Sequence, residues 1–333
     1  MADQGKIRVG FIGSGGIARG HFKRFHGNPK AEVVALCDIS DKAIEAMVAA
    51  NPAAAKCPVY KDWRQMLDKE QLDGVQIHTP HTLHFEQAME SVARGLHVLC
   101  EKPMVCRVDH AKELIKSVDK AGIVFALSYQ RHHMPEFRYV REVVGSGDMG
   151  PLHYIQAFQA QGWYRGTMGS WRQDPSLSGG GQLNDSGSHL VDIVLWTSGL
   201  VPASVFAYIE KLEAPVDILT AASVRFTSGA IGTFSVIGHA TGWWEDITWF
   251  LDKGAIYMRN GALSVMGEKG RMTEPARGEL PVGSDPDTNW IGAILGTETN
   301  EAPPECGLRV IQFTEAAWLS GDSGLPSAVV FDD

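Results

Sequence analysis

Short runs of β-branched and other apolar residues alternate with amphipathic stretches of helical length over the first 127 residues. The predicted strands are 8–12, 32–37, 74–77, 97–100 and 123–127, and the predicted helices between them are 43–50, 63–68, 82–94 and 110–121. Strands that alternate with helices are typical of βαβ units, which build a parallel sheet. Gly95 and Gly122 follow two of these helices closely, as expected where a residue in the left-handed conformation ends a helix. The pattern therefore predicts an α/β domain.

After Ser128 the pattern changes to longer strands separated by turns. Helices are predicted at 135–144 and 307–320, and strands at 152–161, 202–212, 219–227, 230–238, 247–250 and 255–259. This arrangement predicts a second α/β domain with a large, mainly antiparallel sheet. Several strands, such as 205–209, have apolar residues on both faces, so we expect helices on one face and a second subunit on the other.

The predicted domains are therefore 1–127 and 128–333. The possibility that the C-terminal helix packs back toward the first domain stays open. The oligomer expected through the second sheet is a homodimer or a homotetramer.

Composition narrows the class of partner. The chain is 44% hydrophobic and 21% charged, with a net charge of −9, and this acidity argues against a nucleic-acid partner. Residues 1–6 run directly into a strand and leave no room for a secretion signal, and no apolar stretch reaches membrane-spanning length. The five cysteines are scattered without CxxC spacing, which indicates neither disulfides nor a metal site. We expect a cytoplasmic protein that binds a small molecule.

A glycine-rich turn follows the first strand. It reads Gly13-Ser14-Gly15-Gly16-Ile17-Ala18, which is G-x-G-x-x-A. Such a turn lets the backbone approach a pyrophosphate, and the helix that follows offers free N–H groups. Asp38 ends the second strand, where a carboxylate would accept hydrogen bonds from the adenosine ribose. These residues predict NAD binding, since Asp38 would repel the 2′-phosphate of NADP and the next residue, Ile39, is not an arginine that could offset this repulsion. NADP is the alternative, because Lys42 could reach the same region. The alternative is a glycine-rich turn that only connects a strand to a helix.

Two further groups carry candidate chemistry. Lys102, within Glu101-Lys102-Pro103, follows the apolar run 97–100, where a strand end would face a nicotinamide. Three glycines at 179–181 precede Asp185 and His189, which stand one turn apart if a helix begins near Asp185. A carboxylate beside an imidazole suits general-base removal of a hydroxyl proton. The alternatives are that Asp185 caps a helix, that His189 is a core histidine and that Lys102 is a surface lysine.

Together these residues resemble the family of glucose-fructose oxidoreductase and inositol dehydrogenase, usually written Gfo/Idh/MocA. The resemblance runs along nearly the whole chain, from the glycine-rich turn through Asp38, Thr79-Pro80 with His84, and Glu101-Lys102-Pro103 to Gly147-Asp148-Met149-Gly150 and the segment 185–189. It implies a Rossmann domain followed by an open-faced α/β domain with the nicotinamide between them. It also implies a cis peptide between Lys102 and Pro103.

The resemblance assigns roles to these positions. Lys102 would hydrogen-bond the reacting hydroxyl, and Asp185 and His189 would be the acid/base pair. The glycine-rich turn and the family resemblance together predict the following cofactor contacts: Gly13, Ser14, Gly15, Gly16, Ile17, Ala18, Asp38, Ile39, Thr79, Pro80, His81, His84, Glu101, Lys102, Trp171 and Arg172. His81 departs from the family, which commonly has Asn there. The candidate substrate contacts are Arg131, Trp163 and Tyr164 with Asp185 and His189, although the aromatic pair could equally belong to the core.

Three functions follow as hypotheses. The first is an NAD(P)-dependent dehydrogenase in which His189, assisted by Asp185 and Lys102, takes the proton from a secondary alcohol of a sugar, sugar derivative or cyclic polyol. The second is a glycosidase or lyase that uses bound NAD in a transient oxidation, elimination and reduction. The third is a nucleotide-sensing regulator without turnover.

Overall fold

The computed structural model of the chain describes residues 5–330, which pack into two compact units. The first unit contains the residues up to Val105, Asp109–Gln130 and Ser284–Glu305; the second contains Cys106–Val108, Arg131–Gly283 and the chain from Cys306 onward. The sequence-based division at residue 127 stays a prediction, because this grouping records which residues pack together and not which segments fold alone.

The first unit is built on a six-stranded sheet with the order β3-β2-β1-β4-β5-β6, and every neighbouring pair is parallel. Its strands are β1 (Ile7–Ile12), β2 (Ala31–Cys37), β3 (Val59–Tyr60), β4 (Gly74–Ile77), β5 (His97–Cys100) and β6 (Phe125–Leu127). This is the order of a doubly wound dinucleotide-binding fold, whose ligand site lies at the carboxyl ends of the strands. The predicted parallel α/β domain is confirmed.

Helices cover this sheet. They are α1 (Gly16–Gly27), α2 (Asp41–Ala50), η1 (Pro52–Lys56), α3 (Trp63–Lys69), η2 (His81–Leu83), α4 (His84–Ala93), α5 (Val108–Ala121) and α10 (Pro286–Ile294). Helix α1 buries Ala18, Phe22 and Phe25, which are spaced to share one face. The rings of Phe22 and Phe25 meet Phe11 of β1 edge-on, with centroids 6.1 and 6.2 Å away.

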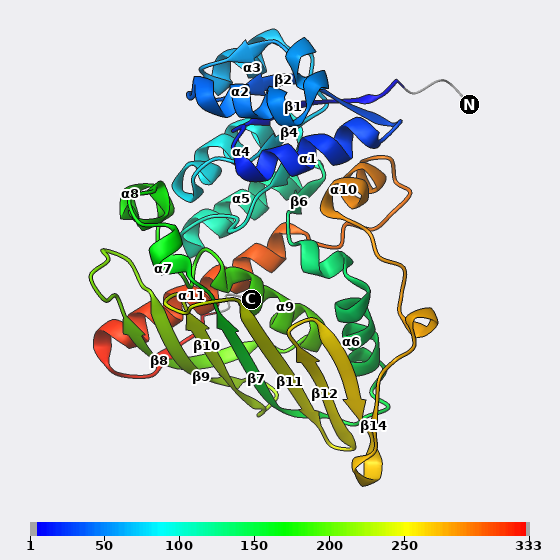
Figure 1. The fold of residues 1–333 in the computed structure, drawn as a ribbon, viewed down its shortest axis with the longest axis vertical. Coiled ribbons are helices and arrows are strands. Elements are labelled where there is room, and N and C mark those ends of the chain that lie inside the picture. Colours follow the sequence, from blue (N-terminus) through cyan, green and yellow to red (C-terminus); the bar gives the residue numbers. More distant parts are fainter. Residues whose placement is uncertain (1–4, 331–333) are drawn as a thin grey trace. The chain divides into compact units, whose positions relative to one another are not determined.

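Helix α10 packs beside α1 although more than 250 residues separate the two in sequence (Figure 1). Its Trp290 and Ile291 are buried in the same core as Phe25. The sequence analysis did not predict this helix.

The second unit contains a nine-stranded sheet with the order β14-β13-β12-β11-β7-β10-β9-β8-β15. Its strands are β7 (Leu152–Ala160), β8 (Pro202–Glu210), β9 (Leu219–Phe226), β10 (Ile231–Ile237), β11 (Trp244–Leu251), β12 (Gly254–Arg259), β13 (Ala262–Met266), β14 (Met272–Thr273) and β15 (Ser327–Ala328). Figure 1 shows β7 among the strands, where it pairs in parallel with β10, while the other pairs are antiparallel. A mainly antiparallel sheet was predicted here and is confirmed.

Helices lie on one face of that sheet. The helices of this part of the chain are η3 (Gln130–His133), α6 (Pro135–Ser146), α7 (Trp163–Gly166), η4 (Trp171–Gln173), α8 (Pro175–Ser178), α9 (Gly187–Ser198), η5 (Glu268–Gly270), η6 (Arg277–Glu279) and α11 (Pro304–Ser323). Phe313 of α11 packs on Phe234 of β10, and Ser320 accepts a hydrogen bond from the Ala207 amide of β8. Burial alternates strictly along β9, so its other face is open in the single chain.

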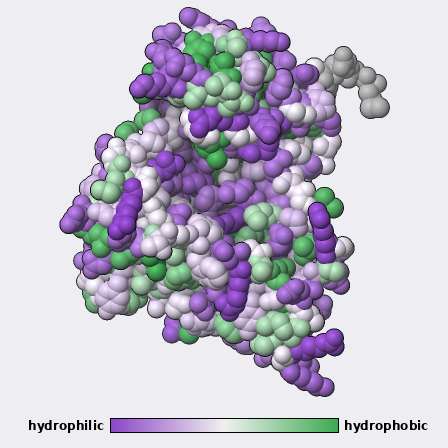
Figure 2. All heavy atoms as spheres, viewed as in Figure 1, coloured by the Kyte–Doolittle hydropathy of each residue, from purple (hydrophilic) through white to green (hydrophobic). Residues whose placement is uncertain are grey.

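No helix among residues 5–330 is long and apolar enough to cross a membrane. On the face drawn in Figure 2, hydrophobic side chains are scattered among hydrophilic ones.

Candidate functional site

The glycine-rich turn lies where β1 ends and α1 begins. Gly13 has a φ of +91°, and a Cβ there would lie 2.9 to 3.0 Å from the backbone of His78 and Thr79, so only glycine fits. A Cβ on Gly15 would have no described atom within 4 Å, so this backbone faces open space. Ala18 is fully buried, as close packing of helix on strand requires. The turn therefore has the shape that a pyrophosphate needs, with the N-terminus of α1 directed at it.

Asp38 lies beside this turn. Its carboxylate accepts hydrogen bonds from the amides of Ser14 (2.7 Å) and Ser40 (2.8 Å), one on each oxygen. Ile39, directly after it, is 87% exposed. The carboxylate is thus oriented by two backbone donors and keeps further lone pairs for a ligand. The predicted pairing of turn and acid is present, and the residues fit NAD.

We expect Asp38→Ala to raise the Kd for NAD about tenfold or more and to narrow the preference for NAD over NADP, because the ribose loses its acceptor and a 2′-phosphate loses a like charge. Fluorescence titration with each cofactor measures this without a substrate. Asp41→Ala, which removes an exposed carboxylate paired with Lys61, is the matched control. An unchanged ratio of the two Kd values would remove Asp38 from the cofactor site.

His84 joins the two turns that follow β4 and β5. This buried ring lies 2.8 Å (Nδ1) from the carbonyl oxygen of Pro103 and 2.9 Å (Nε2) from that of Thr79. Burial lowers its pKa against the effect of both contacts. His81 is also buried, with its ring centroid 5.9 Å from that of His84. His84 therefore connects the two turns that are predicted to contact the cofactor. Its own direct contact with NAD stays a prediction.

Lys102 follows β5 and is half buried. Its peptide bond to Pro103 is cis, as the family resemblance implied. The neighbouring Glu101 is buried and its carboxylate lies 3.0 Å from Nε2 of His21, a residue that the sequence analysis did not single out.

Asp185 lies two residues before α9, which begins at Gly187 and carries His189 in its first turn. The buried carboxylate accepts hydrogen bonds on Oδ2 from the Trp163 indole (2.8 Å) and from Nε of Arg172 (3.0 Å). Two donors thus share one oxygen of this buried carboxylate. His189 is partly exposed, as a group that must reach a ligand has to be.

The glycine-rich loop before Asp185 is held by Asp217, another residue that the sequence analysis missed. Its carboxylate accepts hydrogen bonds from the amides of Gly181 (2.8 Å) and Leu183 (2.7 Å) and from the Trp318 indole (3.1 Å). Burial raises the pKa of Asp217, and these donors oppose that rise. A Cβ on Gly181 would lie 2.0 Å from the Asp217 carbonyl oxygen. Glycine is therefore needed at position 181 for the close approach of the loop to the protein's own backbone at Asp217.

Arg131 forms an ion pair with Glu245 (2.7 Å), and both side chains are about nine-tenths buried. They line a cavity of about 200 Å³ together with Met134, Glu136, Phe137, Trp243, Met258, Asn260 and Gly261. Glu245 pairs across the sheet with Gln159, whose amide donates to Ser186 just before α9. The cavity therefore lies on the same face of the sheet as α9, the helix that contains His189.

Other predicted residues have structural contacts that their proposed roles do not require. Trp163 is 6% exposed and packs on Val216 and Ile218, with Tyr164 beside them. The guanidinium of Arg172 lies 4.6 Å from the centroid of the Trp171 ring. The first unit thus brings together the predicted cofactor residues of the glycine-rich turn and Asp38, and the second brings Asp185 together with Trp163 and Arg172. The functional roles of all these residues stay predictions.

Two family models match the chain. One, described as the oxidoreductase family with an NAD-binding Rossmann fold, matches residues 7–129, and the GFO/IDH/MocA C-terminal domain matches residues 137–273.

Curated relatives are distant. The rhizopine catabolism protein MocA of Rhizobium meliloti is 26% identical over 205 residues, which is 60% of this chain and 59% of that protein. Levoglucosan dehydrogenase of Pseudarthrobacter phenanthrenivorans is 24% identical over 270 residues, 71% of this chain and 68% of that protein. The chain thus spans about three fifths of the length of the first of these relatives.

Among solved structures, the WlbA dehydrogenase from Bordetella pertussis, in complex with NADH and UDP-GlcNAcA, has a TM-score of 0.84 and 25% identity, with 98% of this chain and all of that chain covered.

Proposed function

Since the chain belongs to the Gfo/Idh/MocA family of oxidoreductases and carries its NAD-binding Rossmann domain, we propose that it is a dehydrogenase that oxidises a secondary hydroxyl of a sugar, a sugar derivative or a cyclic polyol. The observation that carries the proposal is the Asp185 site, in which a buried carboxylate with two fixed donors precedes the helix that presents His189. The names of the relatives, a rhizopine catabolism protein and a levoglucosan dehydrogenase, support a substrate rich in hydroxyl groups.

In this proposal the chain's own residues handle the proton. The Lys102 ammonium donates a hydrogen bond to the reacting hydroxyl oxygen and stabilises the negative charge that develops on it. His189 takes the hydroxyl proton as general base, and the Asp185 carboxylate favours the charged imidazole that results. NAD, when bound, would accept the hydride from the carbinol carbon, so that the alcohol becomes a ketone.

We place a second part of the substrate in the cavity beside Arg131 and Glu245. Its size, about 200 Å³, suits a sugar-sized group. The buried ion pair offers donors and acceptors that hydroxyl groups can share.

The test is a spectroscopic assay of purified protein with NAD and a panel of aldoses, glycosides, sugar acids and inositols at mildly alkaline pH. Sustained formation of NADH with one class supports the dehydrogenase and identifies its substrate. Cleaved glycoside without net NADH would replace it with the transient-oxidation glycosidase. NAD binding without any reaction would favour the regulator.

We also propose that the chain forms a homodimer or homotetramer in the cytoplasm through the open face of the second unit's sheet. Tyr154, Phe250 and Tyr257 lie in edge-to-face contact on neighbouring strands of that face, and Phe250 is 37% exposed. Apolar residues exposed in a cluster are typical of subunit contacts.

We expect light scattering to give the mass of two or four chains, and Phe250→Lys to shift it toward that of one, because the charge would be buried on association. Val282→Lys adds the same charge at a residue that is 88% exposed and outside the sheet, and should leave the mass unchanged. A monomeric parent protein would contradict the proposal.

A further inference from the structure

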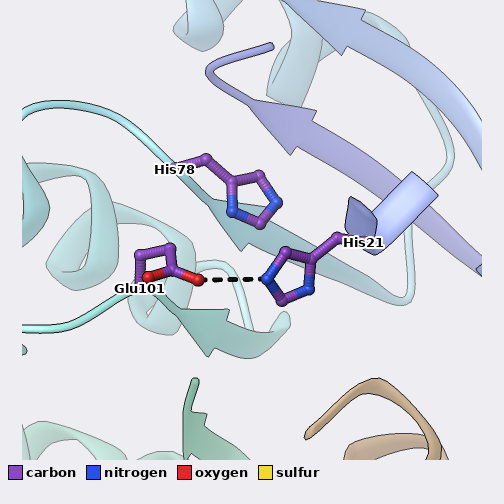
Figure 3. A group of neighbouring side chains, drawn as sticks. All are labelled: His21, His78 and Glu101. Carbon is purple, nitrogen blue, oxygen red and sulfur yellow. Dashed lines mark hydrogen bonds and ion pairs between the residues drawn. The ribbon is translucent and has the colours of Figure 1, made fainter. Parts of the chain in front are cut away.

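A chain of buried polar side chains connects three distant segments of the first unit. His21 of α1 lies 3.0 Å (Nε2) from Oε1 of Glu101 and 2.8 Å (Nδ1) from Oδ1 of Asp287 in α10. His21 and Asp287 are 1% exposed and Glu101 is 8% exposed. Figure 3 shows the rings of His21 and His78 and the Glu101 carboxylate turned toward one another from three different segments.

The geometry indicates that His21 is charged. Both ring nitrogens face a carboxylate oxygen, and since a carboxylate only accepts, both nitrogens must donate. Burial lowers the pKa of His21, but Asp287 and then Glu101 outweigh it and raise the pKa to about 9. His21 in turn holds the pKa of Glu101 well below its usual range, against the effect of burial.

Other groups around the ring complete the balance of charge. Arg24 forms an ion pair with the second oxygen of Asp287, and the amide of Gln76 donates to the first. His78 faces His21 from the end of β4, and burial lowers its pKa to about 3, so it stays neutral. Two cations thus compensate the two buried carboxylates, as a stable buried network requires. With both nitrogens of His21 engaged, we interpret the cluster as a hydrogen-bonded network and not as a metal site.

This network ends at Lys102. The second oxygen of Glu101 lies 3.3 Å from the Lys102 backbone N–H, and the Glu101 amide donates to Ile77 of β4 at 2.9 Å. His84 contacts the carbonyl of Pro103 on the other side of Lys102. The backbone of Lys102 is therefore fixed between groups that are themselves buried and bonded.

We propose that His21 and Asp287 are positioning residues that hold Glu101 and, through it, the backbone of Lys102, so that helix α10 takes part in catalysis from the far end of the sequence. This inference rests on the proposed function, in which Lys102 contacts the reacting hydroxyl. A small displacement of such a group costs much more in turnover than in cofactor binding.

The test compares His21→Gln and Asp287→Asn with the parent protein, using His26→Gln, an exposed histidine on the same helix, as the control. We expect kcat per NAD-binding site to fall about tenfold to a hundredfold while the KM for NAD changes less than about threefold. The primary deuterium isotope effect of the sugar should rise as hydride transfer becomes limiting. A lower Tm with unchanged kcat per site would reduce the network to a structural role and overturn the inference.

A second readout needs no substrate. In a ¹⁵N NMR titration, we expect the His21 ring to keep both protons up to a pH of about 9 and to lose one at lower pH in Asp287→Asn. A neutral His21 ring at pH 7 would overturn the inference. If the parent protein reduces NAD with none of the sugars tested, the proposed function is contradicted. The NMR titration still reports on the network in that case.

The same pKa values set the direction of the pH dependence of stability. Because the folded pKa of His21, about 9, exceeds its ordinary value of 6.5, its contribution to stability is complete below pH 6.5 and is lost as the pH rises to about 9. His78, with a folded pKa of about 3, acts oppositely and costs stability as the pH falls below 6.5. Thermal unfolding should therefore show a decline toward pH 9 that His21→Gln lacks; an equal decline in both would contradict a charged His21.

Discussion

Lys102→Ala is expected to lower turnover of the sugar substrate about a thousandfold, and His189→Ala by a similar factor, with NAD affinity changed less than about threefold. The two residues have different tasks in the proposed reaction. Lys102 stabilises charge on the hydroxyl oxygen, and His189 removes its proton. Neither belongs to the glycine-rich turn or to the Asp38 contacts that we assign to the adenosine end of the cofactor. The loss should therefore appear in kcat and not in the binding of NAD.

Single-turnover kinetics and NAD titration measure the two quantities separately. Lys120→Ala, an exposed lysine near the end of α5, is the control for removal of an ammonium group. Turnover that survives in Lys102→Ala or His189→Ala would exclude that residue from the chemistry. A matching loss of NAD binding would show a role in holding the cofactor.

Gly181→Ala is expected to lower the free energy of unfolding by about 3 to 5 kcal/mol, from the loss of two hydrogen bonds to a buried carboxylate. A Cβ there would lie 2.0 Å from the carbonyl oxygen and 2.6 Å from the amide nitrogen of Asp217, and both atoms are backbone. The loop must therefore move away from Asp217. Since Asp185 follows four residues later, turnover should fall as well. Chemical denaturation and the sugar assay measure the two effects.

Gly145→Ala is the matched control. Gly145 lies inside α6, and a Cβ there would meet no described atom within 4 Å. This change should leave stability equal or raise it by up to about 1 kcal/mol. A Gly181→Ala protein as stable as the parent would show that the loop does not depend on its contact with Asp217.

The sequence predicted the elements whose local pattern is strong. The alternation of strands and helices before residue 127 identified the parallel sheet, and the glycine-rich turn followed by Asp38 predicted a carboxylate beside the turn, which the structure contains. These predictions succeeded because each signal lies within about 30 residues, the length of one βαβ unit.

The predictions failed where a contact joins distant parts of the chain. Nothing near Asp217 or Asp287 indicates that they meet Gly181 and His21, since only the folded chain brings them together. A local signal for α10 does exist, because Asp285 caps the helix and Pro286 occupies its first position, but nine residues are too few for clear periodicity. The start of α9 was placed near Asp185, whereas the helix begins at Gly187.

The place of α10 also limits how the chain can be divided. Trp290 is fully buried in the first unit, and Gly74 of β4 leaves room for its ring, since a Cβ there would lie 2.9 Å from it. A fragment that stops at residue 127 would expose the surface that Trp290 covers and would leave His21 without Asp287. Exchange of the first unit with that of a relative by recombination would thus require crossovers after Gln130, after Gly283 and after Glu305, and a single junction would yield hybrids with an incomplete core.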